Sequence, residues 1–87
     1  GGPRARAHLR HPAGNENAVW IVTLAPGAEG VPHVVTREET FVAIAGTARA
    51  TVAGETHDVT AGSALVVPPG VPFSLANPFP QPFEAVA

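Results

Sequence analysis

Two residues near the middle of the chain, His33 and Glu39, carry the side chains best suited to chemistry. A carboxylate beside an imidazole can form an acid–base pair, with Glu39 orienting His33 or holding it charged. Both side chains are also common ligands of divalent metal ions. The chain contains no cysteine, which excludes a thiol nucleophile and a zinc–thiolate site. His33 and Glu39 are therefore the candidate catalytic residues if the protein is an enzyme, and no serine or lysine pairs convincingly with them.

Strands must position this pair, because no part of the sequence sustains a helical period. Glycines at positions 46, 54, 62 and 70 lie eight residues apart, a spacing typical of short strands in a sandwich or barrel. Nine short strands are predicted, at residues 5–9, 19–24, 32–36, 40–45, 47–52, 55–60, 64–67, 73–76 and 83–86. So many strands without a helix need closure to hide their edges, which favours an all-β barrel or jelly roll.

The composition fits one small folded domain over residues 1–87. Apolar residues make up 45% of the chain and charged residues only 14%, which argues against disorder. The ten prolines and nine glycines suit strands separated by many turns. Since the chain begins Gly1-Gly2 and contains no methionine, we expect these two residues to be a tag remnant and the natural start to lie elsewhere.

The order of glycines, prolines and polar residues is more specific than an all-β fold requires. Residues 27–46 contain Gly27, His33, Glu39 and Gly46, and residues 62–77 contain Gly62, Pro68, Gly70 and Asn77. The spacing of these two sets resembles the first and second motifs of the cupin superfamily, which they match in register. The resemblance implies a jelly-roll barrel (a double-stranded β-helix) with an interior pocket, and commonly a homodimer.

The chain departs from the family pattern at two positions. The resemblance implies that metal-binding members hold one divalent ion through residues equivalent to positions 33, 35, 39 and 73. Here Val35 and Phe73 replace two of the histidines, so only His33 and Glu39 carry over. Protein metal sites normally use three or more side-chain ligands, so we predict no bound metal, with a divalent transition metal on His33 and Glu39 as the alternative.

Alternation of side chains along strands places His33, Glu39 and their apolar neighbours on one face. The predicted pocket is lined by His33, Val35, Glu39, Phe41, Phe73 and Trp20. The sequence therefore favours a small-molecule-binding cupin barrel with a degenerate metal site. A metal-dependent enzyme of dioxygenase, isomerase or cyclase type with a rebuilt site is the alternative. A metal-free enzyme using His33 and Glu39 is a third possibility, and a hydrogen-bonded His33–Glu39 plug in the core is the purely structural one.

Several partners are disfavoured by the charge pattern. The net charge is −2 and the five arginines are scattered, so we see no basic stripe for a nucleic acid. No apolar run reaches the roughly 20 residues that span a bilayer, and no secretory leader is visible, so a cytoplasmic protein is expected.

A homodimer is predicted because the 19–24 run and the N-terminal strand offer an edge that a second copy can cover. The proline-rich segment 78–82 is interpreted as a lid or a surface connection.

Overall fold

The computed structural model describes the backbone of residues 8–10 and the whole of residues 21–87. The described residues form strands and no helix, which confirms the predicted all-β class. The strands are β1 (His8–Arg10), β2 (Ile21–Leu24), β3 (His33–Val34), β4 (Glu39–Ala45), β5 (Thr47–Val52), β6 (Glu55–Thr60), β7 (Ala64–Val67), β8 (Pro72–Ala76) and β9 (Phe83–Val86). Within this part of the chain, no helix long and apolar enough to cross a membrane is found.

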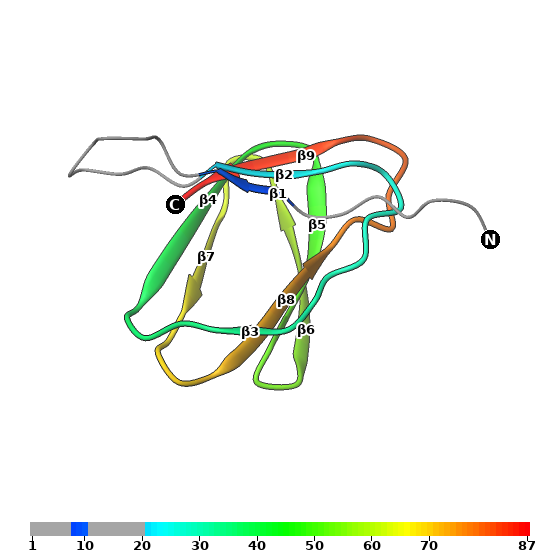
Figure 1. Cartoon of the computed structure of the whole chain (residues 1–87). Coiled ribbons are helices and arrows are strands. Elements are labelled where there is room, and N and C mark those ends of the chain that lie inside the picture. Colours follow the sequence, from blue (N-terminus) through cyan, green and yellow to red (C-terminus); the bar gives the residue numbers. More distant parts are fainter. Residues whose placement is uncertain (1–7, 11–20) are drawn as a thin grey trace.

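The strands form two antiparallel sheets that enclose the interior of a jelly-roll barrel (Figure 1). The five-stranded sheet has the order β1-β2-β9-β4-β7, and the four-stranded sheet has the order β3-β8-β5-β6. Neighbours in the sheets are distant in sequence, since β2 pairs with β9 and β5 pairs with β8. This crossing of connections between two sheets is the jelly-roll arrangement predicted from the glycine spacing.

The core lies between the sheets and follows the two-residue period of each strand. In β5, the small side chains of Ala48 and Ala50 are fully buried while Arg49 between them is exposed. In β8, Phe73 and Leu75 point inward in the same way. Large inward side chains on β8 thus lie beside small ones on the neighbouring β5 of the same sheet, as Leu75 does beside Ala50, so the inner face of this sheet is closely packed.

The predicted strands 47–52, 55–60, 64–67 and 83–86 are observed with the same bounds. Each of them is closed by turn residues that fix where pairing stops. The other strands differ from their predicted ranges. β4 and β8 each begin one residue earlier than predicted, β3 covers two residues of the predicted 32–36, and β1 overlaps 5–9 at residues 8–9 only. β2 is observed at 21–24, and residues 19–20 of its predicted range lie outside the described part of the chain. The remainder of the predicted first strand, residues 5–7, lies outside the described part of the chain.

Gly46, the last residue of the first motif, has a structural reason for being glycine. Its φ is +74°, and a Cβ placed there would collide with the carbonyl oxygen of Pro82. Gly46 therefore lets the β4–β5 turn approach the segment that leads into β9, where a side chain would force the two apart.

Asn77, the last residue of the second motif, is the buried polar residue of the core, with no exposed side-chain surface. Its Nδ2 donates hydrogen bonds to the Leu24 carbonyl at 3.1 Å and the Gln81 carbonyl at 2.7 Å. Its Oδ1 accepts from the Phe79 N–H at 3.0 Å. One amide thus joins the end of β2 to the β8–β9 connection, which includes the proline-rich segment 78–82.

The backbone of Asn77 also binds the segment between β2 and β3. Its carbonyl accepts from the Gly27 N–H at 2.7 Å, and its N–H donates to the Ala28 carbonyl at 2.9 Å. Further along, a Cβ on Gly30 would overlap the backbone of Leu75 in β8. The segment between β2 and β3 is therefore held close against the end of β8, and this contact sets the path into β3.

We predict that Asn77→Ala lowers the free energy of unfolding by about 2–4 kcal/mol, because it leaves two carbonyls and one N–H without their partner in the interior. Asn77→Asp, which keeps the shape but loses the donor, should also destabilise the protein. Urea denaturation monitored by circular dichroism measures both changes.

A matched control is Thr56→Ala in β6, where the exposed hydroxyl lies 3.4 Å from that of Thr51. This control should change stability by no more than about 0.5 kcal/mol. Equal effects of the two alanine variants would contradict the structural role assigned to Asn77.

Candidate functional site

A pocket of about 190 Å³ opens between β3, the start of β4 and β8. It is lined by His33, Val34, Val35, Glu39, Phe41, Phe73 and Ala87. A much smaller cavity of about 30 Å³ adjoins it and shares His33, Phe41 and Phe73 with it. The pocket is large enough for a small organic molecule, since a dry cavity of about 150 Å³ accommodates benzene.

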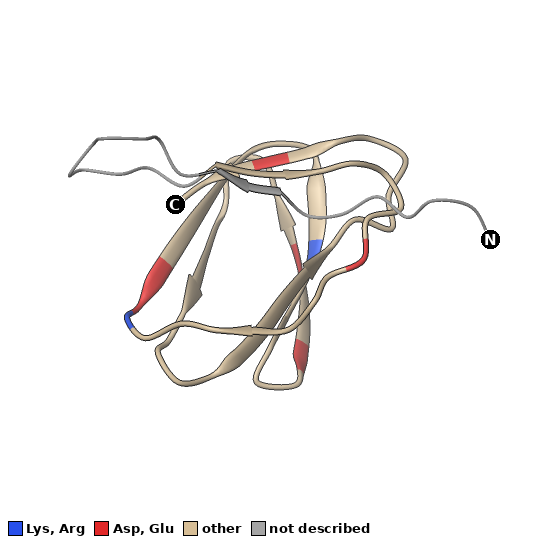
Figure 2. Cartoon of the chain, in the orientation of Figure 1, with Lys and Arg blue, Asp and Glu red and all other residues tan. Residues whose placement is uncertain are grey.

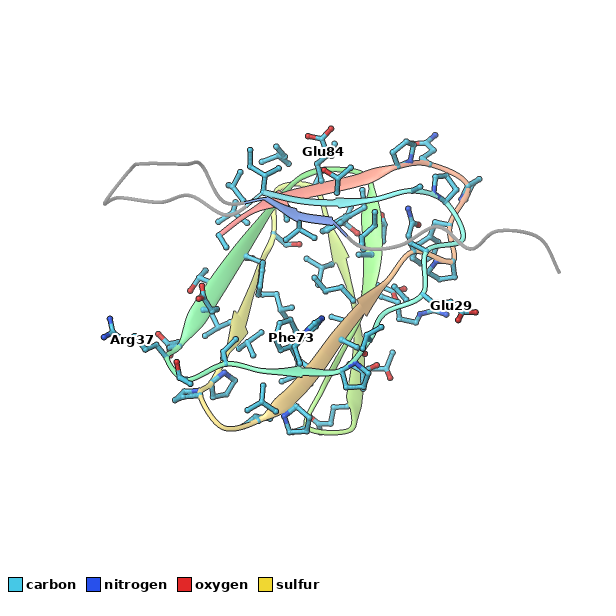
Figure 3. The ribbon with its side chains drawn as sticks, in the orientation of Figure 1. Glu29, Arg37, Phe73 and Glu84 are labelled. Carbon is cyan, nitrogen blue, oxygen red and sulfur yellow. The ribbon has the colours of Figure 1, made fainter. Side chains whose placement is uncertain are left out.

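Strand register brings the pocket residues together. His33 in β3 is the direct cross-strand partner of Phe73 in β8, so both side chains lie on the inner face of the four-stranded sheet. Glu39 and Phe41 lie two residues apart in β4 and share the inner face of the other sheet. Phe73 points into the space between the sheets (Figure 3). The pocket therefore has one wall from each sheet.

Val35 is placed by a backbone contact and not by the sheet. Its carbonyl accepts a hydrogen bond of 2.9 Å from the Gly70 N–H in the turn between β7 and β8. Gly70 has a φ of +75°, which glycine adopts without strain. This contact fixes the backbone of Val35, whose side chain packs against the core and lines the pocket.

The two polar side chains of the pocket differ in exposure. His33 is exposed to solvent, and Glu39 is half-buried. Among the described side chains, no hydrogen bond or ion pair joins His33 to Glu39. The interpretation of this pair as a hydrogen-bonded plug in the core is therefore wrong, because β3 is an edge strand and leaves His33 at the mouth of the pocket.

Three rings form a continuous wall. The ring centroids of His33 and Phe73 lie 6.0 Å apart at an angle of 45°. Those of Phe41 and Phe73 lie 5.6 Å apart at 41°. These tilted contacts fall in the range favoured for aromatic pairs. Since Phe41 and Phe73 are buried, the wall is fixed by the core and only its pocket side can meet a ligand.

The structure brings together His33, Val35, Glu39, Phe41 and Phe73, all of which were predicted from the sequence to share a pocket. The sixth predicted residue, Trp20, lies outside the described part of the chain. Two lining residues, Val34 and Ala87, were not predicted. Ala87 follows β9, whose pairing with β4 carries it to the pocket, and no local sequence signal reveals that pairing.

The donor set of the pocket does not fit a closed metal site. His33 and Glu39 supply two ligands, whereas protein sites for zinc and similar ions normally have at least three. No group of three or more His, Asp or Glu side chains that could hold a metal ion occurs among the described residues. Val35 and Phe73 line the same pocket as His33 and Glu39, so the four positions that the motif resemblance implies as metal ligands lie together, although two of them are apolar.

Comparison with known proteins places the chain in a family. The sequence model of the cupin domain matches residues 20–87, and the chain belongs to this family. The search of curated proteins found no match. The match to the cupin domain agrees with the two sequence motifs and with the observed barrel.

Solved structures with the same fold include proteins of different kinds. The cupin domain of Cnp3 from Schizosaccharomyces pombe is 19% identical, with a TM-score of 0.81 over 92% of this chain and 61% of that one. A cupin domain from Bordetella pertussis is 24% identical, with a TM-score of 0.76 over 99% of this chain and 94% of that one. A recombinant oxalate oxidase in complex with glycolate is 21% identical, with a TM-score of 0.78, but this chain spans only 48% of it. These similarities show a shared fold.

We predict that the double substitution Val35→His and Phe73→His creates a metal site with His33 and Glu39. Four ligands in one pocket should bind Co²⁺ at least about 100-fold more tightly than the unmodified protein, because each added imidazole supplies a missing ligand. Visible absorption of the Co²⁺ complex measures both the affinity and the coordination.

The single substitutions serve as controls and should give intermediate affinities. A folded double variant with unchanged Co²⁺ affinity would contradict the assignment of positions 35 and 73 to the ligand sphere. Elemental analysis of the unmodified protein is the complementary measurement: stoichiometric transition metal that disappears in His33→Ala would support the enzyme alternative.

Proposed function

We propose that this protein is a small-molecule-binding cupin barrel with a degenerate metal site. The observation that carries the proposal is the pocket of about 190 Å³, whose apolar and aromatic walls hold two polar groups, His33 and Glu39. Concave, mostly apolar pockets with a few placed polar groups are the usual form of small-molecule sites. We further propose a cytoplasmic location, in line with the sequence-based expectation.

A metal-dependent enzyme with a rebuilt site is the second candidate. The fold similarity to an oxalate oxidase supports it, since that protein carries an activity on the same barrel. Against it stands the number of ligands, because His33 and Glu39 would need partners from elsewhere. A metal-free acid–base role for His33 and Glu39 requires them to act on a ligand separately, since no hydrogen bond between them is seen in the described residues.

The binding proposal predicts that benzyl alcohol, which combines an apolar ring with one hydroxyl, binds saturably in the pocket. Val35→Phe fills part of the pocket and should weaken binding at least about tenfold, a loss of about 1.4 kcal/mol. Protein-observed NMR titration measures the affinity and shows which residues respond.

Val66→Phe is the matched control, because Val66 is exposed on β7 and does not line the pocket. It should bind benzyl alcohol as the unmodified protein does. No saturable binding to the unmodified protein, or equal weakening in the two variants, would overturn the proposal.

We also propose that the protein forms a homodimer through one face of the five-stranded sheet. Of the edge expected at residues 19–24 and the N-terminal strand, β2 is paired on both sides, by β1 and β9, whereas β1 is the end strand of the sheet. A second surface open to a partner is the outer apolar face of this sheet, which consists of the exposed Ile21, Val42, Ile44, Ala64 and Val66 and the half-buried Val86.

The outer apolar face is continuous across four strands. Ile21, Val86, Val42 and Ala64 form one cross-strand row, as their pairings show. Ile44 lies at an irregularity in the β4–β9 pairing and is 53% exposed. With strands about 4.8 Å apart, four strands span roughly 15–20 Å. A dimer formed through this face would therefore bury an interface area near the lower end of the range found for specific protein–protein interfaces.

The scarcity of charge on the outer side of the five-stranded sheet favours a second copy as the occupant of this face. Among the described residues of its outer side, Glu84 on β9 is a charged side chain that points away from the barrel beside the apolar row (Figure 3). A two-fold axis places an apolar face against itself, so no complementary charge is needed. Apolar patches of this kind commonly mark protein contacts.

The dimer proposal predicts that Ile44→Lys combined with Val66→Lys weakens self-association at least about 100-fold, because each dimer then places four uncompensated charges in an apolar contact. Sedimentation velocity over a concentration series measures the dissociation constant. Thr56→Lys, on the exposed side of the other sheet, is the control and should leave association unchanged. An unmodified protein that stays monomeric at micromolar concentrations would contradict the dimer.

Nucleic acids and membranes are not proposed as partners. Acidic side chains are distributed over the described part of the barrel, where Arg37 and Arg49 are the basic residues (Figure 2). Arg49 is paired with Asp58 at 3.1 Å and lies over the ring of Phe79 at 5.3 Å. This arrangement does not form a basic surface that follows a phosphate backbone.

A further inference from the structure

The pocket carries one carboxylate, and no arginine or lysine is among its lining residues. Glu39 is the acidic side chain in its lining. Of the two arginines with described side chains, Arg49 pairs with Asp58 on the opposite sheet, and Arg37 extends away from the barrel (Figure 3). Glu39 is also half-buried. A ligand that fills the pocket will therefore displace water from a carboxylate.

This displacement restricts the ligand. A carboxylate that loses water without gaining a hydrogen-bond donor pays a large desolvation penalty. An ammonium group replaces the water with a charge-assisted hydrogen bond, which is about twice as strong as a neutral one. A second carboxylate would instead meet Glu39 as a like charge, with no arginine in the lining to separate them.

The aromatic wall favours the same ligand. Phe41 lies on the same face of β4 as Glu39, two residues further on, and its ring lies 5.6 Å from that of Phe73. The faces of aromatic rings attract cations within about 6 Å of the ring centroid. A group bound to Glu39 thus lies beside rings that stabilise positive charge, while Val35 and Ala87 contribute apolar surface for the rest of the molecule.

We infer that the pocket binds a small organic ammonium ion, with the ammonium group on Glu39 against the rings of Phe41 and Phe73. The apolar part of the ligand occupies the remaining space, and a cavity of about 190 Å³ suits a benzyl or short branched alkyl group. This inference rests on the proposed function, because it names the chemical class of the ligand for the same pocket.

The test compares three probes of nearly equal size at pH 8: benzylammonium, benzyl alcohol and benzoate. They share one ring and differ in whether the polar end is positive, neutral or negative. We expect benzylammonium to bind at least about tenfold more tightly than benzyl alcohol, and benzoate to bind most weakly. Isothermal titration calorimetry and NMR titration give the three affinities.

Two matched variants test whether Glu39 causes the preference for benzylammonium over benzyl alcohol. Glu39→Gln keeps the shape of the side chain and removes its charge, so the ratio of benzylammonium to benzyl alcohol affinity should fall to about one. Glu38→Gln removes the same charge one residue earlier, where the side chain is exposed and outside the pocket lining. The ratio in Glu38→Gln should equal that of the unmodified protein.

Each outcome tests either the ammonium inference or the proposed binding function. Benzyl alcohol binding as tightly as benzylammonium to the unmodified protein overturns the ammonium inference and leaves the binding function standing. No saturable binding of any probe overturns the binding function itself. A preference that survives Glu39→Gln, or that Glu38→Gln abolishes equally, shows that general electrostatics and not Glu39 attracts the cation, and overturns the inference.

Discussion

The side-chain amide of Asn77 connects parts of the barrel that lie far apart in the sequence. It joins the end of β2 to the β8–β9 connection through three hydrogen bonds, and its backbone holds Gly27 and Ala28 alongside. An amide is suited to this task because it both donates and accepts, so the ends of separate strands can satisfy one another without water. The strand that carries His33 starts only a few residues beyond this contact.

Two motif residues that fix the path of the barrel lie outside the pocket, whereas Phe41 and Phe73 belong to both the core and the pocket lining. Gly46 and Asn77 act through a backbone conformation and a buried amide, and neither lines the pocket. Val35 and Phe73 line the pocket, at two positions where the motif resemblance implies histidine in metal-binding cupins. Both side chains also pack in or against the core, so an apolar residue at these positions adds to the packing of the barrel.

The sequence predicts the strands best where both ends carry a turn signal. The segment from Gly46 to Gly62 is an example: β5 ends at the Ala53–Gly54 turn and β6 ends at the Ala61–Gly62 turn. β3 is shorter than predicted, because the carbonyl of Val35 bonds to the Gly70 turn instead of extending the strand. That contact joins residues 35 positions apart, and strand propensity contains no information about it.

The pocket was predictable wherever strand alternation decides which way a side chain points, as it does for Glu39 and Phe41 in β4. Alternation does not predict how exposed a side chain is to solvent, because that exposure also depends on how many neighbouring strands its own strand has. His33 was expected inside an enclosed barrel and lies at its mouth, because β3 is the edge of its sheet. The contribution of Ala87 depends on the pairing of β9 with β4, which is a property of the whole barrel.

The shortness of β3 has a kinetic consequence. This strand of two residues pairs with β8 alone and is anchored on either side, at Gly27–Ala28 and at Val35. Few hydrogen bonds must break to lift the intervening segment, so its opening requires much less free energy than unfolding of the barrel. The proposed ligand would then enter and leave through a local opening of this segment, and its residence time would depend on the free energy of that opening and not on the stability of the whole barrel.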